Sequence, residues 1–186
     1  MSQDILLLTA LVAVILMGSA MCSGIEAALL AVNPLRVHEL ARRKPKIMGA
    51  KRLEKLRHRI GRTLTVVTIA NNSFNIFGSL MVGSYASFIF QNRIGNVKSI
   101  FFIGLTILVL LLGEIVPKAL GTRLALQISL MSAPVLDFLS IVMRPLLIIL
   151  ERLLPIITAK SELTTDEEEI RQMARLGSQM GQIEAD

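Results

Sequence analysis

The sequence is short of the residues from which most soluble proteins build their sites and surfaces. Its 186 residues include one cysteine, no tryptophan and one tyrosine, and charged residues make up only 18% of the chain. A single cysteine excludes an intrachain disulfide and a cysteine metal cluster, and the shortage of aromatic residues removes the platforms on which nucleic-acid bases stack. Soluble domains are typically about 25% charged, so we expect a protein that lies mostly in a membrane.

The lone cysteine, Cys22, lies inside the first apolar run. Free cysteine commonly behaves as a small buried residue, and this is the role that we expect. A lipoprotein signal at residues 19–22 is the alternative. It fails because Met21 is bulky where a small residue is required, and because the N-terminus carries Asp4 without a lysine or arginine.

Enzyme signatures are missing as well. The sequence contains no His-Glu-x-x-His, Gly-x-Ser-x-Gly or phosphate-loop pattern. Its two histidines, His38 and His58, stand among lysines and arginines, where we expect them to be solvated. The sequence therefore does not predict an enzyme.

Three apolar runs dominate what is present. Residues 5–25, 63–90 and 99–113 contain no charged residue. A helix rises about 1.5 Å per residue and needs about 20 residues to cross a hydrocarbon core. We predict an all-α membrane protein whose transmembrane domain, residues 1–157, has three transmembrane helices at about 5–32, 63–90 and 98–122.

Positive charge is concentrated between the first two spans. Eleven of the 20 lysines and arginines lie in residues 33–62, which begin with a helix stop and restart at Asn33-Pro34. Short loops rich in lysine and arginine stay in the cytoplasm, so this basic helical connector is predicted to be cytoplasmic, with the N-terminus outside and the C-terminus in the cytoplasm. The net charge of +6 then reflects topology in a plasma or inner cell membrane. We expect the lipid bilayer, and no nucleic acid, as its partner.

Residues 128–157 are apolar enough for a fourth span, but they are interrupted. Four charges and three prolines interrupt them: Asp137, Arg144, Glu151 and Arg152, and Pro134, Pro145 and Pro155. A charge at the bilayer centre costs roughly 2.5–3.5 kcal/mol on insertion scales. The charges fall about two turns apart, which predicts a stripe that faces water while the apolar side chains face lipid. We predict broken interfacial helices on the cytoplasmic surface, and a fourth span stays open.

Residues 158–186 differ in composition and predict the start of a cytosolic helical linker. Thr165 and Glu168 have the spacing of a capping box, a motif in which each side chain accepts from the other residue's backbone N–H. Apolar residues then recur at near-helical spacing up to Ile183. We expect an amphipathic helix that packs against a partner surface.

A few polar side chains lie inside the predicted spans. They are Ser23 and Glu26 in the first, Asn71, Asn72, Ser73 and Asn75 in the second, and Glu114 in the third. Such residues usually face a bundle interior or a wet cavity. At about 1.5 Å per residue, all of them fall near the midplane or in the cytoplasmic half. Three spans therefore bring oxygen atoms to a similar depth.

Residues 113–118, Gly-Glu-Ile-Val-Pro-Lys, are the most informative run. Pro117 has no N–H, so the carbonyl of Gly113, four residues back, loses its helical donor. A free carbonyl beside the Glu114 carboxylate makes a hard-oxygen cation site, which suits Mg²⁺ or Ca²⁺ better than Zn²⁺ or Cu²⁺. Lys118, four residues after Glu114, could neutralise the carboxylate when no ion is bound.

Structural explanations compete with this hypothesis. Asparagine and serine in spans often only hydrogen-bond neighbouring helices, Pro117 alone is a kink, and a Glu114–Lys118 pair could be structural. Small residues in the first span leave room for close helix approach: Gly18, Ser19, Ala20, Ser23, Gly24, Ala27 and Ala28. An unpaired carboxylate in a membrane is expensive, which favours a function for Glu114.

Three motifs, in this order, resemble the transmembrane domain of the CorC/CNNM family of magnesium transporters. They are SGIEAAL at 23–29, ANNSFN at 70–75 and GEIVPK at 113–118. The ordered set covers essentially the whole chain. The tail at 167–184 also resembles the helical lead-in to a pair of CBS domains, which these 186 residues do not include.

The resemblance implies a homodimeric Mg²⁺ exporter, thought to be coupled to Na⁺ entry, in which ATP binds only to the CBS domains. It implies that six residues surround Mg²⁺: Ser23, Asn71, Asn75 and Glu114 through side chains, and Gly24 and Gly113 through backbone carbonyls. Four others are assigned a supporting place behind them: Glu26, Asn72, Pro117 and Lys118. Animal members carry other residues at Glu26, Asn72 and Lys118.

Two other functions stay open from the sequence. One is a non-transporting Mg²⁺ sensor that regulates another channel, and the other is a membrane anchor for cytosolic domains. Flux through protein in sealed liposomes separates transport from both. Bound metal in a Glu114→Gln variant separates the sensor from the anchor.

Overall fold

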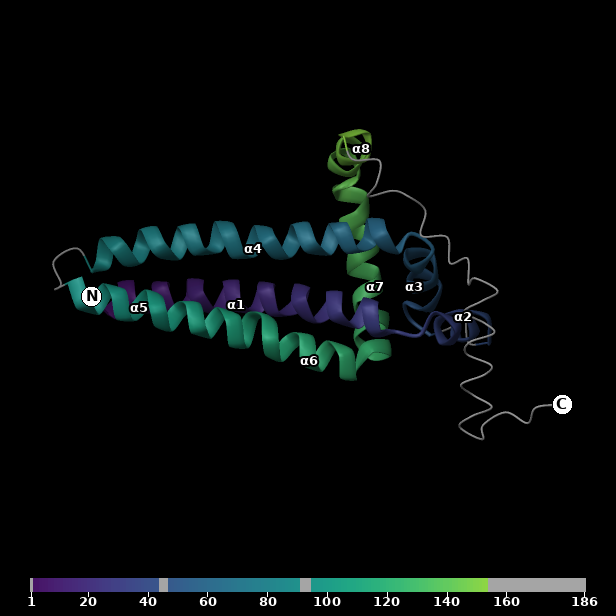
Figure 1. The fold of residues 1–186 in the computed structure, drawn as a ribbon, viewed down its shortest axis with the longest axis horizontal. Helices are drawn as coiled ribbons and strands as arrows, with labels where there is room; N and C mark the ends of the chain where they lie inside the picture. Colours follow the sequence, from purple (N-terminus) through teal and green to yellow (C-terminus); the bar gives the residue numbers. More distant parts are fainter. Residues whose placement is uncertain (1, 44–46, 91–94, 154–186) are drawn as a thin grey trace, which may run out of the picture.

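The computed structural model describes residues 2–43, 47–90 and 95–153, and all regular structure in these ranges is helical (Figure 1). In chain order the elements are α1 (Ser2–Ala31), α2 (Pro34–Arg43), α3 (Ala50–Arg57), α4 (Ile60–Ile89), α5 (Gly95–Leu108), the π-helical segment η1 (Val109–Ile115), α6 (Val116–Arg123), α7 (Ala125–Val142) and α8 (Arg144–Leu153). The predicted fold class, an all-α membrane protein, is confirmed. The linker predicted at 158–186, with its capping box, lies outside the described residues.

Three long rods lie side by side and form the body of the molecule: α1, α4 and the continuous run α5–η1–α6 (Figure 1). Helix α1 contacts both of the other rods. At one end of the bundle, where α1 ends and α4 begins, lie α2 and α3, and α7 crosses the rods there (Figure 1). Because α1 touches both neighbours, its polar side chains can meet groups from each of them.

Three helices in the described ranges are long and apolar enough to cross a membrane: Gln3–Ala31, Lys98–Arg123 and Ala125–Val142. The first two correspond to the predicted spans 5–32 and 98–122. The predicted span 63–90 is also a long helix, α4, but its asparagines and serines make it less apolar than these three. Helix α1 lies alongside α4 (Figure 1) and covers part of the polar surface of α4.

Helix α7 is apolar, yet it lies crosswise to the three rods (Figure 1). If the rods cross the bilayer, α7 lies near its surface, so the interfacial position of 128–157 stays a prediction. The expected break at Pro134 is wrong, since α7 continues through it to Val142. A proline frees only the carbonyl four residues back. Here that carbonyl belongs to Leu130, and it abuts Gly49 of the connector.

Two charges of this region face the connector and not water, which corrects the predicted water-facing stripe. Asp137 Oδ1 lies 3.4 Å from Lys55 Nζ, and Glu151 Oε1 lies 3.3 Å from Arg62 Nε. The side chains of Asp137 and Glu151 are only 25% and 28% exposed. These two ion pairs fasten α7 to α3 and α8 to α4.

The predicted stop and restart at Asn33-Pro34 is confirmed, because α1 ends at Ala31 and α2 begins at Pro34. Asn33 Oδ1 accepts hydrogen bonds from the N–H groups of Leu35 (2.9 Å) and Arg36 (3.4 Å), which satisfies donors that a helix start leaves free. Arg57 Nη1 donates to the Leu29 carbonyl oxygen at 2.7 Å and so stabilises the last turn of α1. Burial lowers the pKa of Arg57, but from so high an ordinary value that the side chain keeps its charge.

The connector meets α7 at Gly49, directly before α3. Its φ of 88° is a left-handed conformation that other residues rarely adopt. A Cβ at Gly49 would also overlap the Leu130 carbonyl oxygen. Both the backbone conformation and the contact therefore require glycine here.

Two apolar clusters flank the middle of the bundle. The cluster at the connector end comprises Leu29, Val32, Val37, Leu53, Leu56, Val67, Ala133 and Leu136. The cluster at the far end is built on Leu8, Val82 and Ala86, with Phe101 and Phe102 packed against it. Three buried polar side chains, Ser19, Ser23 and Asn71, lie between these clusters in sequence, so the bundle has a polar middle.

Candidate metal site

A serine of α1 contacts both of the other rods in the middle of the bundle. The sequence predicted only a packing role for this residue. Ser19, in α1, is completely buried. Its Oγ lies 3.2 Å from Asn71 Oδ1 of α4 and 3.4 Å from the Gly113 carbonyl oxygen of η1. A hydroxyl has one proton and can donate it to one acceptor at a time. Oxygen atoms of α1, α4 and η1 therefore lie together, and a single proton is available between them. Such a group of oxygens favours the binding of a cation.

Asn75 lies one turn along α4 and faces Glu114 of η1. Its Nδ2 donates to Glu114 Oε1 at 3.4 Å, and Glu114 is half-buried. The Oδ1 of Asn75 is buried and has no hydrogen-bond partner in the described part of the chain. The pair thus places a carboxylate beside an amide oxygen whose lone pairs are unused.

Ser23 follows Ser19 by one turn of α1 and is also completely buried. Among the residues that the structure describes, its Oγ has no hydrogen-bond partner. Leaving a buried polar atom unpaired costs about 1–3 kcal/mol, and an ion or an ordered water is the usual explanation. Ser23 Oγ is therefore a second oxygen that could bind an ion.

Glycines bring the backbone of α1 against the third rod. A Cβ on Gly24 would lie 3.3 Å from the carbonyl oxygen of Pro117, and one on Gly113 would lie 3.3 Å from Ser19 Oγ. A Cβ on Gly121 would overlap the Gly24 carbonyl oxygen. The small residues therefore serve close packing. The Gly24 carbonyl, which the resemblance assigns to the ion, faces Gly121 of α6 in this structure.

The chain before Pro117 is wound as a π-helix. The N–H of Val116 donates to the carbonyl of Leu111, five residues back. Such wide turns occur frequently at functional sites. Lys118, four residues after Glu114, is exposed. Among the described residues there is no ion pair between Lys118 and Glu114, so the pairing predicted for them does not form.

Two other residues of the predicted set lie off the cluster. Glu26 Oε1 accepts a hydrogen bond from Thr68 Oγ1 at 3.0 Å, about one turn nearer the connector than Ser23. Asn72 is exposed. The structure thus joins Asn71 and Gly113 through Ser19, and joins Asn75 to Glu114. Ser23 lies one turn from Ser19, with Gly24 and Pro117 in the adjoining helix contact, while Glu26, Asn72 and Lys118 lie away.

Sequence reasoning missed Ser19 and Thr68 as members of the polar surface. Helical spacing carries a signal for both. Ser19 precedes Ser23 by four positions, and Thr68 precedes Asn71 and Asn75 by three and seven, which are the offsets that share a helix face. A search for polar residues at these offsets would have found them.

The atoms of the cluster that could bind an ion are oxygens, and only one of the side chains is charged. The described residues contain no group of three or more His, Cys, Asp or Glu side chains that could hold a metal. The cluster instead offers hydroxyl, amide and carbonyl oxygens with the Glu114 carboxylate. These are hard ligands that suit Mg²⁺ or Ca²⁺, and fewer charged ligands mean weaker binding.

Together, these features define an α-helical membrane protein with an oxygen-rich cluster buried between its long helices. The Cyclin M transmembrane N-terminal domain family, CNNM, matches residues 10–186. A Synechocystis protein named UPF0053 protein sll1254 is 36% identical over 181 residues, which cover 96% of this chain and 51% of that relative. The chain belongs to the CNNM transmembrane domain family, as the motifs predicted.

That family is transporter-like and is generally linked to Mg²⁺ transport. The chain spans about half the length of its Synechocystis relative. The activity of a whole protein of that length is therefore a matter for proposal.

Proposed function

We propose that this domain transports Mg²⁺, with the ion bound between α1, α4 and η1. Among the residues that the structure describes, the observation that carries the proposal is the buried, unpartnered Asn75 Oδ1, on the side chain that donates to the Glu114 carboxylate, together with the buried, unpartnered Ser23 Oγ one turn of α1 from Ser19. A bound cation would use these lone pairs. It would also replace the Ser19 proton that Asn71 Oδ1 and the Gly113 carbonyl share.

The predicted topology supports export as the direction of transport. With the basic connector in the cytoplasm, the cluster lies toward the cytoplasmic side, from which an exporter loads. One carboxylate binds Mg²⁺ moderately, which suits a carrier that must release its ion. Coupling to Na⁺ entry rests on the family resemblance alone. Assembly as a homodimer is supported by the apolar stretch 128–157 and the small-residue helix faces, as well as by the resemblance. We assign the protein to the plasma or inner membrane, with the N-terminus outside.

Flux in sealed liposomes tests the proposal. Wild-type protein should move Mg²⁺, and an opposed Na⁺ gradient should speed it. Glu114→Gln keeps the shape and one oxygen but removes the charge, so it should abolish flux while the protein still folds. Asn71→Ala should weaken binding less, because water can replace a neutral ligand. Asn72→Ala is the matched control, since Asn72 is the next residue and is exposed.

Each outcome has a clear meaning. Transport by Glu114→Gln at the wild-type rate would show that the proposed site is wrong. Mg²⁺ binding without flux in the wild type would instead favour a sensor, and neither binding nor flux would favour an anchor.

Topology and assembly are tested separately from transport. A cysteine placed at Ser161, in a Cys22→Ala background, should resist an impermeant reagent added outside intact cells. Ready labelling would mean that residues 128–157 cross the membrane. A mass measurement in mild detergent should report two chains, and a monomer across several detergents and lipids would refute the dimer.

A further inference from the structure

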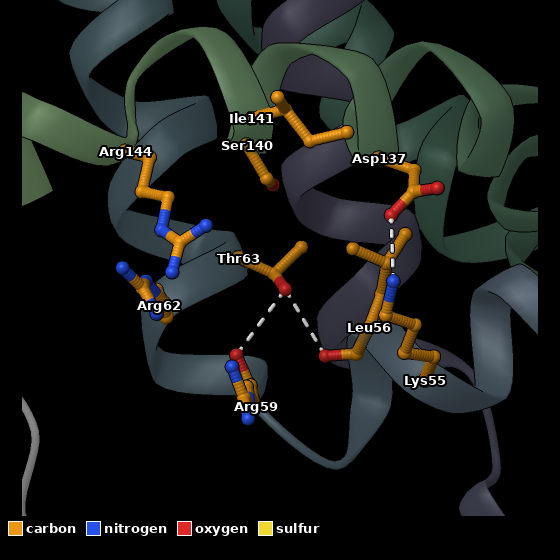
Figure 2. A pocket seen from close by; sticks show the side chains of 9 residues that line it. All are labelled: Lys55, Leu56, Arg59, Arg62, Thr63, Asp137, Ser140, Ile141 and Arg144. Carbon is orange, nitrogen blue, oxygen red and sulfur yellow. Dashed lines mark hydrogen bonds and ion pairs between the residues drawn. The ribbon is translucent and has the colours of Figure 1, made fainter.

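A basic pocket lies at the connector end of the bundle, apart from the oxygen-rich cluster in the middle. It encloses about 240 Å³ between the α3–α4 turn and the facing parts of α7 and α8. Four cationic side chains line it, Lys55, Arg59, Arg62 and Arg144, together with one carboxylate, Asp137 (Figure 2). The cations come from α3, the turn, α4 and α8, so the fold itself gathers them.

The positive charge of this pocket is only partly compensated. Asp137 pairs with Lys55, and Glu151, outside the pocket, pairs with Arg62. Within the described ranges, Arg59 and Arg144 have no carboxylate within 4.0 Å. Figure 2 shows the guanidinium of Arg144 directed toward Arg62. Like charges that converge in a concave site repel one another, and an anion between them would relieve the repulsion.

Hydrogen bonds and ion pairs fix the walls of the pocket. Thr63 Oγ1 is 3.0 Å from the Leu56 carbonyl oxygen and 3.2 Å from that of Arg59, which shapes the α3–α4 turn (Figure 2). The pairs of Lys55 with Asp137 and Arg62 with Glu151 hold α7 and α8 in place. Helices α4 and α8 both begin at the pocket, at Ile60 and Arg144, and helix N-termini favour anions.

The position of the pocket indicates which anion it suits. It lies where the basic connector gives way to the charge-free run that begins at Thr63, the level of phospholipid headgroups. Ile141 lines the pocket and is 64% exposed, and Phe138 and Val142 expose apolar surface beside it on α7. We propose that the pocket binds the phosphate of an anionic phospholipid, with an acyl chain on this face of α7. Guanidinium groups match phosphate oxygens in geometry and charge.

Native mass spectrometry of the full chain in mild detergent tests this, with phosphatidylglycerol and phosphatidylcholine as probes. The wild type should retain phosphatidylglycerol in preference. The double variant R59Q/R144Q should lose this preference by about tenfold or more, at the usual contribution of a cation near an anionic lipid. The matched control R42Q/R52Q removes two exposed connector arginines and the same charge, but neither lines the pocket, so it should lose clearly less of the preference than R59Q/R144Q.

The remaining arms distinguish other occupants. Millimolar inorganic phosphate should not displace the lipid, and D166N/E167Q/E168Q should leave the preference unchanged. Displacement would make this a free-anion site, and a stronger preference in the acid-neutralised variant would assign the pocket to the chain's own acidic segment. Equal losses in both arginine variants, or no preference in the wild type, would also overturn the proposal. If R59Q/R144Q loses helical content, the single variants decide, each with a loss of about threefold to fivefold.

Discussion

Replacing Gly121 by alanine tests how closely α1 and α6 must approach. The new Cβ would overlap the Gly24 carbonyl oxygen and lie 3.1 Å from Ala27 Cβ. The carbonyl is backbone and cannot rotate away, so α6 must move off α1. Gly104→Ala is the matched control, because Gly104 also lies in a helix, α5, and a Cβ there meets nothing within 4 Å.

The size of the effect follows from two opposing terms. Replacing glycine by alanine inside a helix raises the free energy of unfolding by about 1 kcal/mol. In Gly104→Ala no steric overlap opposes this gain. Overpacking a tight contact costs about 1–3 kcal/mol. Because the Cβ in Gly121→Ala overlaps a backbone atom, we expect a cost near the upper end of this range. The two variants should therefore differ by about 2–3 kcal/mol in free energy of unfolding. That difference corresponds to about 4–12 °C in melting midpoint for a chain of this size.

Loss of helical circular dichroism on heating in mild detergent measures the difference, since the chain has no tryptophan for fluorescence. Displacing α6 also moves Pro117 and η1, so Gly121→Ala should bind Mg²⁺ more weakly than the wild type while Gly104→Ala binds normally. A Gly121→Ala protein that melted at or above the temperature of Gly104→Ala would refute the close contact of α1 with α6.

Other substitutions test the remaining contacts. Ser19→Ala removes the one proton that Asn71 Oδ1 and the Gly113 carbonyl share, so the apo protein should lose about 1–3 kcal/mol. Saturating Mg²⁺ should raise its melting midpoint more than that of the wild type, and an equal rise would count against a shared site. Gly49→Ala combines a left-handed φ with overlap on Leu130 and should lose about 2 kcal/mol or more by thermal melting; a neutral result would mean that α3 is not held against α7. Arg57→Gln removes a 2.7 Å charged hydrogen bond to Leu29 and should lose about 1.5 kcal/mol; the Arg42→Gln variant, at an exposed site, should show no change in melting.

Charge and proline patterns predicted much of the fold. The charge-free runs located α1, α4 and the α5–η1–α6 rod, and Asn33-Pro34 marked where α1 gives way to α2. Pro134 misled because a helix tolerates the loss of one hydrogen bond when the freed carbonyl finds another neighbour, here Gly49. The charges of 128–157 misled because their partners, Lys55 and Arg62, are far away in the sequence.

The residues of the candidate cluster could be predicted from the sequence better than the contacts between them. Asn71, Asn75 and Glu114 stood out because polar groups in apolar runs are expensive. Ser19 did not, since a serine among small residues is as readily explained by packing. The π turn has no periodic signature in one sequence, because it widens a single turn. The Glu114–Lys118 offset of four did not produce an ion pair, because Glu114 faces Asn75 of α4 while Lys118 is exposed.

The polarity of α4 has a consequence for how the chain is made. Helix α1 and the 98–123 helix are apolar enough to enter a bilayer alone, whereas α4 is not among the helices of that character. Two of its asparagines, Asn71 and Asn75, find polar partners only when Ser19 and Glu114 reach them from the other two rods. We therefore expect α4 to leave the translocon late, after the 98–123 helix has been synthesised, with the basic connector held back on the side of the ribosome. The polar residues proposed to bind an ion would then also determine the order in which the helices enter the membrane.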